Sequence, residues 1–248
     1  MSKILVFGTR GQVATKLQRL APVQALGRDM VDLANPFSCA EAIRVHRPTA
    51  VINAAAYTAV DRAEAEEALA TTINGAAPAT MAYACAALRI PLVHISTEYV
   101  FDGGGTRPFA PNDATAPQNA YGRSKVAGEQ GIRATGASHA ILRTSWVFSA
   151  HGTNFVKTML RLAESHDELR VVNDQFGGPT PARAIASACL ELARQLQVDP
   201  GKSGTYHFSD APNVNWCDCA RAIFAAAGRA TRVQGIPRAN ILRLPPDR

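Results

Sequence analysis

Short apolar runs alternate with helical segments along most of this 248-residue chain, and this alternation constrains its fold more than any other feature. Six runs are typical of buried strands: residues 4–7, 23–26, 50–52, 92–95, 140–142 and 169–172. Alanine-rich segments with helical periodicity lie between them: residues 63–70, 76–88, 121–133, 154–165 and 182–196. Strands and helices that alternate at this interval form right-handed βαβ units. We therefore predict an α/β fold around a doubly wound parallel sheet.

The segments between these elements carry two further signals. Ser38 and Glu41 have the spacing of a capping box, which predicts a helix that begins at Ser38 and continues to Pro48. The stretches 102–119 and 173–181 are rich in Pro, Gly and Asn and are too long for tight connections. Because such loops commonly carry binding residues, we expect both to border a ligand cleft.

Composition excludes several protein classes. Hydrophobic residues make up 47% and charged residues 19%, which excludes a disordered or fibrous chain. No apolar run is long enough to span a membrane, and the start of the chain does not resemble a signal peptide, so we expect a soluble, cytoplasmic protein. The five cysteines form no C-x-x-C pair and no histidine spacing matches a zinc site, so we expect no metal.

The formal charge of +6 is unevenly distributed. Residues 229–248 contain five arginines and one aspartate, so the rest of the chain is only weakly basic. No basic stripe runs over the body of the chain, and we therefore expect no nucleic-acid partner.

A glycine-rich turn follows the first apolar run. Gly8, Gly11 and Ala14 have G-x-x-G-x-x-A spacing, and a helical pattern begins directly after them. Such a turn lets backbone N–H groups and the helix dipole approach a pyrophosphate. The position between a strand and a helix therefore indicates a Rossmann-type dinucleotide site, with these candidate cofactor-binding residues: Gly8, Arg10, Gly11, Gln12 and Val13.

The end of the second strand bears on which dinucleotide binds. The sequence Gly27-Arg28-Asp29 offers no clear acidic residue about twenty positions after the turn to take the ribose hydroxyl of NAD. Arg28, together with Arg10, could instead pair with a 2′-phosphate. We predict NADPH, with NADH as the alternative if both arginines are merely solvated.

Tyr121 and Lys125 are four residues apart on a predicted helix, which places them on one helix face. A free tyrosine has a pKa of about 10, and a nearby cation lowers it. We expect Lys125 to lower the pKa of Tyr121 in this way and so make it a better proton donor. Thr97, at the end of a strand, would share a substrate carbonyl with Tyr121.

Six segments resemble a known family: residues 8–14, 53–61, 96–101, 121–125, 143–148 and 174–180. They resemble the extended short-chain dehydrogenase/reductases and, within that group, the dTDP-4-dehydrorhamnose reductase family, over residues 3–236. The resemblance implies NADPH-dependent reduction of the 4-keto group of dTDP-4-dehydro-L-rhamnose to dTDP-L-rhamnose. It also implies a dTDP-sugar as the substrate and a possible homodimer.

The resemblance assigns roles to individual residues. The catalytic set would be Thr97, Tyr121 and Lys125. Along the dinucleotide would lie Asn53, Ala54 and Ala55, together with Tyr121 and Lys125. The substrate-binding residues would be Thr97, Glu98, Tyr99, Trp146, Gln175 and Thr180. An ordinary core position remains the alternative for Trp146.

The family pattern also predicts the organisation of the chain. Residues 1–149 would form an NAD(P)-binding Rossmann domain, and residues 150–248 a small C-terminal substrate lobe interleaved with it. The C-terminus looks shorter than in the family, so we expect Trp216 and Phe224 to lose part of their cover. Lys16 stands where some members have a magnesium-linked Glu, so magnesium is unlikely there.

Two other functions stay open. One is a sugar-nucleotide dehydratase or epimerase of the same superfamily, which would recycle its hydride. The other is a non-catalytic dinucleotide-binding subunit that regulates a partner. Consumption of NADPH, catalytic recycling or no turnover distinguishes these functions.

Overall fold

A computed structural model describes residues 3–105 and 107–241. Contacts divide the chain into two compact units, Met1–Thr144 with Ala182–Phe208, and Ser145–Pro181 with Ser209–Arg248. The predicted division made residues 150–248 a lobe interleaved with the first domain. Residues 182–208 pack with the first unit, because their helix covers its sheet and their strand pairs at its edge.

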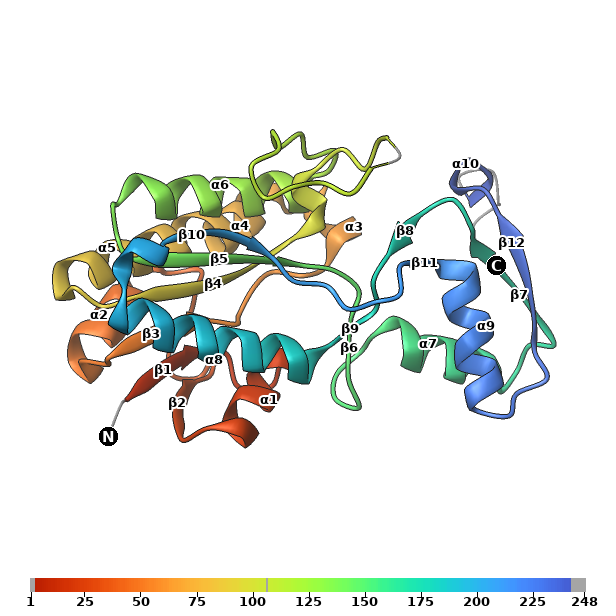
Figure 1. The fold of residues 1–248 in the computed structure, drawn as a ribbon, viewed down its shortest axis with the longest axis horizontal. Coiled ribbons are helices and arrows are strands. Elements are labelled where there is room, and N and C mark those ends of the chain that lie inside the picture. The colour runs from red at the N-terminus through yellow and green to blue at the C-terminus, as the bar shows by residue number, and fades with distance from the viewer. Residues whose placement is uncertain (1–2, 106, 242–248) are drawn as a thin grey trace. The chain divides into compact units, whose positions relative to one another are not determined.

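Six parallel strands form the sheet of the first unit, in the order β10-β5-β4-β3-β1-β2 (Figure 1). Their bounds in chain order are β1 Ile4–Phe7, β2 Val23–Leu26, β3 Ala50–Asn53, β4 Leu92–Thr97, β5 His139–Thr144 and β10 Gly204–His207. The chain winds outward in both directions from β1 and β3, so the strand order reverses between these two neighbours. This is the predicted doubly wound α/β fold, and ligands bind such sheets at the carboxyl ends of the strands around the reversal.

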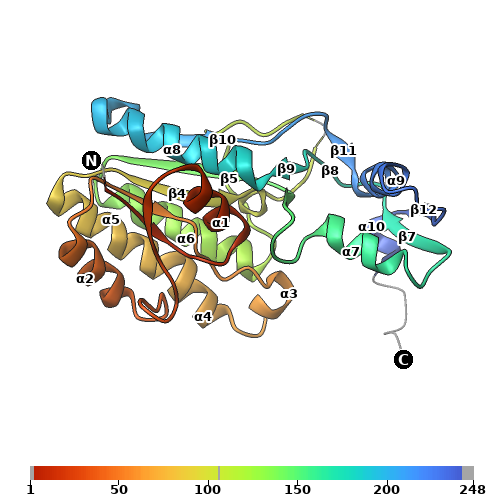
Figure 2. The same cartoon turned by 90° about the horizontal axis from the view of Figure 1, so that it is seen from below.

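Helices cover both faces of this sheet (Figure 2). On one side are α1 (Gln12–Leu20) and α8 (Ala182–Val198), which pack against each other. On the other side are α2 (Pro36–His46), α5 (Ala77–Leu88) and α6 (Ala120–Ala134). Apolar side chains of the strands are buried on both sides, as parallel sheets require. This burial fixes the carboxyl ends of the strands in place.

The helix predicted at 63–70 is wrong in detail. The segment forms α3 (Val60–Ala63), α4 (Glu67–Thr71) and a π-helical turn, η1 (Thr72–Ala76), that leads into α5. The unit also contains two short 3-10 turns, η2 (Glu98–Val100) and η3 (Pro200–Lys202).

The capping box is also wrong. Helix α2 begins at Pro36, where a proline loses no helical hydrogen bond. The Ser38 hydroxyl lies inside the first turn and donates to Asp32 O at 3.0 Å and Asn35 O at 2.7 Å. It therefore does not accept a backbone N–H as a cap would.

One strand of the sheet was missed and another was assigned to the wrong sheet. Strand β10 pairs only with β5, at the edge of the sheet, so it needs no apolar run to mark it in the sequence. The run at 169–172 forms β7 (Glu168–Val172), which pairs with β12 (Arg232–Ile236) in the second unit.

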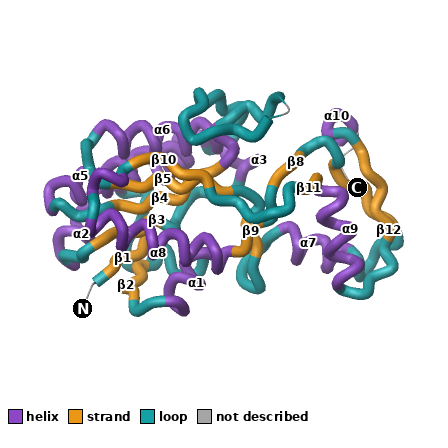
Figure 3. Tube along the Cα trace, in the orientation of Figure 1, coloured by secondary structure: helices purple, strands orange, loops and turns teal. Residues whose placement is uncertain are grey.

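In its described residues, the second unit is built from short strand pairs and helices (Figure 3). The other strands are β6 (Val147–Phe148) with β9 (Thr180–Pro181), and β8 (Phe176–Gly177) with β11 (Val214–Asn215). The helices are α7 (Phe155–Leu162), α9 (Trp216–Ala226) and α10 (Arg238–Ile241). Phe224 is 2% exposed in the apolar core, so the expected loss of cover is wrong for this residue. Trp216 packs against the same core and is partly exposed. Residues 242–248 lie outside the described part.

The five cysteines are buried and unpaired. Cys217 and Cys219 lie on α9, as helix residues of the core. Within residues 3–105 and 107–241, no helix is long and apolar enough to cross a membrane.

Candidate active site

The predicted phosphate-binding turn lies where the carboxyl ends of β1 and β3 meet. Gly8 has a φ of +110°, a conformation that side chains disfavour. A Cβ at this position would lie 3.3 Å from Ala54 O and 3.5 Å from Ala14 Cβ. Gly8 is therefore required both by its own backbone and by the close approach of the segment after β3.

Helix α1 starts at this turn, and its N-terminus is not capped by a side chain. Gly11 occupies the N-cap, no side chain caps the helix, and its first turn has no acidic residue. Ala14 is fully buried behind the turn, as the predicted close packing requires. Gln12 and Val13 occupy the first turn of the helix. The backbone N–H groups and the helix dipole make a site that fits the pyrophosphate of a dinucleotide.

Three charged residues surround the adenosine end of such a site. Arg10 and Arg28 are exposed, and Arg28 Nε lies 3.8 Å from Asp32 Oδ1. Asp29, which the sequence reasoning set aside, turns back over the end of β2, where its Oδ1 leaves no room for a Cβ on Gly27. Thr9 Oγ1 lies 3.0 Å from the same position. The end of β2 thus carries the cation of Arg28 and the carboxylate of Asp29, while Arg10 lies in the turn after β1. The spacing of 21 residues between Gly8 and Asp29 was the available signal.

Thr97 ends β4, and the residues after it turn back toward it. Its hydroxyl donates to Glu98 Oε2 at 3.1 Å and accepts from Tyr99 N at 3.2 Å. Burial raises the pKa of Glu98 to about 7, against the opposing effect of its hydrogen bonds. Tyr99 packs edge-on against Tyr121, with ring centroids 5.7 Å apart. The structure therefore brings together the predicted residues Thr97, Glu98, Tyr99 and Tyr121.

Tyr121 follows the N-cap of α6, where Asn119 Oδ1 accepts from Gly122 N at 2.7 Å. Burial and then the negative charge of Glu98 raise the pKa of Tyr121, and a hydrogen bond with Thr97 opposes them. The expectation of a lowered Tyr121 pKa is wrong, because desolvation raises it. The phenol stays protonated at neutral pH and can donate its proton.

Lys125 lies one turn further along α6 and is only 2% exposed. Its Nζ donates to Ile95 O at 2.7 Å and lies 3.1 Å from His94 Nε2. Burial lowers the pKa of Lys125 to about 8, although Glu129 acts in the opposite direction. His94 in turn lies 3.1 Å from Asn53 Nδ2. The sequence reasoning missed His94, which reads as a core residue inside an apolar strand.

Glu129 and Arg143 form a second buried group beside this one. Arg143 Nη2 donates to Glu129 Oε2 at 2.6 Å and Arg143 Nε to Oε1 at 2.9 Å. Ser96 Oγ and Arg133 Nη2 also donate to Glu129, at 2.7 and 2.8 Å. Arg143 Nη1 donates to Pro111 O at 3.1 Å, which ties the long loop after β4 to the sheet.

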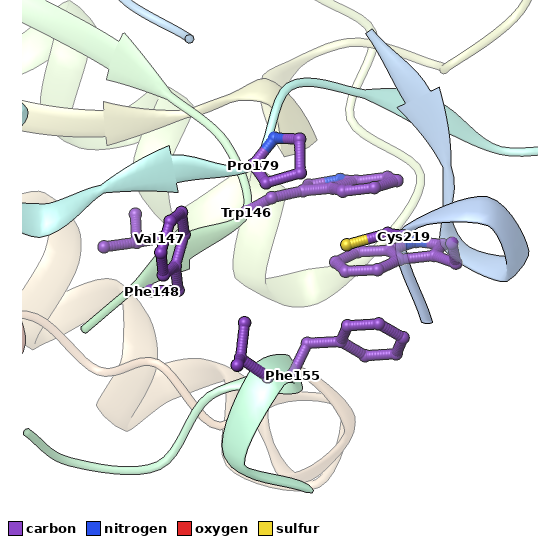
Figure 4. A pocket seen from close by; sticks show the side chains of 8 residues that line it. Trp146, Val147, Phe148, Phe155, Pro179 and Cys219 are labelled. Atoms are coloured by element: carbon purple, nitrogen blue, oxygen red, sulfur yellow. The ribbon is translucent and has the colours of Figure 1, made fainter. Parts of the chain in front are cut away.

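The other predicted substrate residues belong to the second unit. Trp146 has a φ of +46° and stacks on Trp216, with ring centroids 3.3 Å apart. Its ring leaves no room for a Cβ at Gly177, at a distance of 2.7 Å. The side chains of Trp146, Phe148 and Phe155 line a cavity of about 70 Å³ (Figure 4). Trp146 is thus part of an aromatic cluster inside its own unit.

Gln175 and Thr180 differ in exposure. Thr180 is fully buried, donates to Gly178 O at 2.8 Å and accepts from Asp210 N at 3.3 Å. Its hydroxyl therefore holds the loop together within the second unit. Gln175 is partly exposed just before β8.

Comparison with known proteins gives one family over nearly the whole chain. The family described as RmlD substrate binding domain matches residues 2–243. The dTDP-4-dehydrorhamnose reductase of Escherichia coli K12 is 43% identical over 244 residues, which cover 95% of this chain and 80% of that protein. The dTDP-4-dehydrorhamnose reductase of Burkholderia thailandensis is 44% identical, over 90% of this chain and 78% of that protein.

Solved structures agree. The crystal structure of dTDP-4-dehydrorhamnose reductase from Bacillus anthracis in complex with NADP superposes with a TM-score of 0.91. It is 33% identical, and the match covers 97% of this chain and 85% of that one. The predicted resemblance is confirmed.

Proposed function

The chain belongs to the dTDP-4-dehydrorhamnose reductase family, and from this membership we propose that it reduces the 4-keto group of dTDP-4-dehydro-L-rhamnose to give dTDP-L-rhamnose. It is an NADPH-dependent oxidoreductase that carries out the reduction step of dTDP-rhamnose biosynthesis. The residue assignment is supported by the half-buried Tyr121, whose pKa is raised by burial, beside Thr97 and with Lys125 one helical turn away.

Three residues act at the sugar carbonyl. Tyr121 donates its proton to the oxygen that becomes an alkoxide during reduction. Thr97 donates a hydrogen bond to the same oxygen and exchanges its present partner, Glu98, to do so. Lys125 holds the ribose beside the nicotinamide and, when charged, stabilises the phenolate that Tyr121 leaves behind.

NADPH, when bound, supplies the hydride. The turn at Gly8, Gly11 and the first residues of α1 holds its pyrophosphate, and the segment 53–55 lies along it. Arg10 and Arg28 favour the 2′-phosphate, whereas Asp29 would accept from a free ribose hydroxyl. Glu98 and Tyr99 border the sugar. Trp146, Gln175 and Thr180, in the second unit, remain predicted substrate-binding residues.

A stoichiometric assay tests this function. Purified protein should oxidise one NADPH for each dTDP-4-dehydro-L-rhamnose converted, measured as loss of nicotinamide absorbance alongside the dTDP-L-rhamnose formed. Product without net NADPH consumption would indicate an epimerase or dehydratase that recycles its hydride. Binding of NADPH without turnover would indicate a regulatory subunit.

Other expectations remain predictions that the same proposal carries. A cytoplasmic location is supported by five unpaired cysteines, which suit a reducing compartment. A homodimer, the absence of a nucleic-acid partner and the absence of magnesium at Lys16 are open to test by sedimentation, nucleic-acid binding and metal analysis.

A further inference from the structure

Lys125 has an unusual partner for a buried cation. No carboxylate among the described residues lies within ion-pair distance of its Nζ, which contacts His94 and a carbonyl instead. His94 is itself 1% exposed. The proposed function uses Lys125 but gives no role to His94, so the reason for an imidazole at this point needs its own explanation.

Asn53 fixes which nitrogen of His94 carries a proton. The backbone N–H of Ala55 donates to Asn53 Oδ1 at 3.2 Å. Because that N–H can only donate, the amide oxygen has to face it, and Asn53 Nδ2 has to face His94 Nδ1, 3.1 Å away. His94 Nδ1 therefore accepts a hydrogen bond and carries no proton.

The consequence reaches Lys125. Burial and then the charge of Lys125 hold the pKa of His94 well below its usual range, so the ring is neutral. Its single proton is then on Nε2, which faces Lys125 Nζ at 3.1 Å. An ammonium only donates, so it would place two donors against each other, whereas a neutral amine would accept the bond. The hydrogen-bond pattern and burial both favour the neutral amine, which becomes the major form above the Lys125 pKa of about 8.

We propose that His94 is a positioning residue that couples the charge of Lys125 to the orientation of Asn53, at the segment that adjoins the dinucleotide turn. The proposal rests on the proposed function, because it describes regulation of the same site. Ala54 N donates to Phe7 O at 3.0 Å, so the segment 53–55 is tied to the strand that leads into Gly8.

The coupling follows from proton counting. If cofactor binding turns the Asn53 amide, His94 can carry its proton on Nδ1, and Nε2 becomes an acceptor. Lys125 Nζ then takes up one proton from solvent and donates to Nε2 as an ammonium. At a pH near or above its pKa of about 8, Lys125 would thus become charged when the cofactor that needs this charge arrives.

Other charged and titratable groups lie on α6 and on the elements or segments around it. They are Tyr121 and Glu129 on α6, Glu98 after β4, Arg143 on β5, Tyr57 before α3, and Glu64, Glu66 and Glu67 around α4. Glu129 raises the pKa of Lys125, but it is already bonded to Arg143. Glu67 is bonded to Arg123, and Glu66 is bonded to Tyr57 and Arg62. Because these carboxylates already have partners, the proposal is tested at His94 itself.

The first test needs no variant. Nitrogen-15 NMR of the histidine rings in the cofactor-free wild-type protein at pH 8.5, about half a unit above the pKa of Lys125, distinguishes the two tautomers. The proposal requires a proton on Nε2 and none on Nδ1 of His94. A proton on Nδ1, or an imidazolium, would overturn it whether or not the protein has reductase activity. Failure of the NADPH assay would instead contradict the proposed function alone.

The second test follows Lys125 directly. The chain has only five lysines, so carbon-13 labelling of lysine resolves each titration. His94→Gln offers an oxygen acceptor to the ammonium and should raise the Lys125 midpoint by about one pH unit, a tenfold gain in proton affinity. Asn53→Leu removes the hydrogen-bond donor to His94 Nδ1 and should also raise the Lys125 midpoint. This second variant keeps the test valid if one of the two does not fold.

His46→Gln is the matched control. The His46 ring also contacts a side-chain amide, that of Gln24 at 3.0 Å, but His46 is not part of the hydrogen-bond chain from Lys125 through His94 to Asn53. Its Lys125 midpoint should equal that of the wild type. Saturating NADPH should raise the wild-type midpoint and leave that of His94→Gln nearly unchanged. Equal midpoints in all the folded proteins would show that His94 only fills space.

Discussion

Lys125 and Arg143 are both buried cations beside β4, 2% and 4% exposed, but their partners differ. Arg143 makes two bonds to the carboxylate of Glu129, whereas Lys125 faces an imidazole and a carbonyl. Removing one partner of a buried ion pair strongly destabilises the fold, and burying a charge without a counterion costs free energy of folding. We therefore expect Arg143 to serve stability and Lys125 to act on a ligand.

The largest expected effect is on catalysis at Tyr121. Tyr121→Phe keeps the ring and its packing against Tyr99 but removes the transferable proton. We expect kcat to fall by about 10²–10⁴-fold, with the NADPH dissociation constant and thermal stability nearly unchanged. Steady-state kinetics and fluorescence titration check this, and Tyr83→Phe, on the exposed face of α5, is the control. Retained turnover would remove Tyr121 from the mechanism.

Arg143 gives the next largest effect, on stability. Arg143→Met leaves Glu129 buried with only Arg133 and Ser96 as partners. We expect the free energy of unfolding to drop by about 3 kcal/mol, measured by urea denaturation. Arg194→Met, which breaks an exposed pair with Glu191, should leave stability nearly unchanged. Similar losses in the two variants would mean that burial of the pair is unimportant.

Glu98 should make stability depend on pH. Its folded pKa of about 7 exceeds its usual value of 4.5, so the stability due to its protonated form is complete below pH 4.5 and is lost as the pH rises through 7. Glu98→Gln should remove this loss and unfold with about 1–3 kcal/mol more free energy than wild type at pH 8. Urea denaturation at pH 5 and pH 8 checks it. Parallel pH profiles for the two proteins would contradict the raised pKa.

The smallest effect concerns cofactor choice. Removing both Arg10 and Arg28 should lower the ratio of NADPH to NADH affinity by about tenfold, because exposed arginines bind a phosphate through screened charge. Competition titrations with both nucleotides measure the ratio. Arg44→Ala, on α2, should not change it. An unchanged ratio in the double variant would leave Asp29 as the determinant at the end of β2.

The sequence predicted those parts of the fold and site that depend on local patterns. Buried strands need apolar runs, and Gly8 marks a turn that only glycine tolerates, so β1 to β5 and the phosphate turn were expected with nearly correct bounds. Strand β10 was not, because it is defined by pairing with β5, more than sixty residues earlier. The return of 182–208 to the first unit depends on the same distant pairing.

The polar groups show the same limit. Tyr121 and Lys125 were predicted because their spacing lies within one helix. His94 was not predicted, because its contacts depend on tertiary structure. The strand register places it beside Asn53, and the packing of α6 brings Lys125 to its ring. The direction of the Tyr121 pKa was also missed, since desolvation depends on tertiary packing.

Equilibrium unfolding of Lys125→Met, together with its NADPH affinity, tests the contrast between the two cations most directly. The account predicts that this variant is at least as stable as wild type at pH 7, because an unpaired buried cation has been replaced by an apolar chain. It also predicts that NADPH affinity and turnover both fall. Lower stability with normal NADPH binding would contradict it and would make Lys125 a structural residue like Arg143.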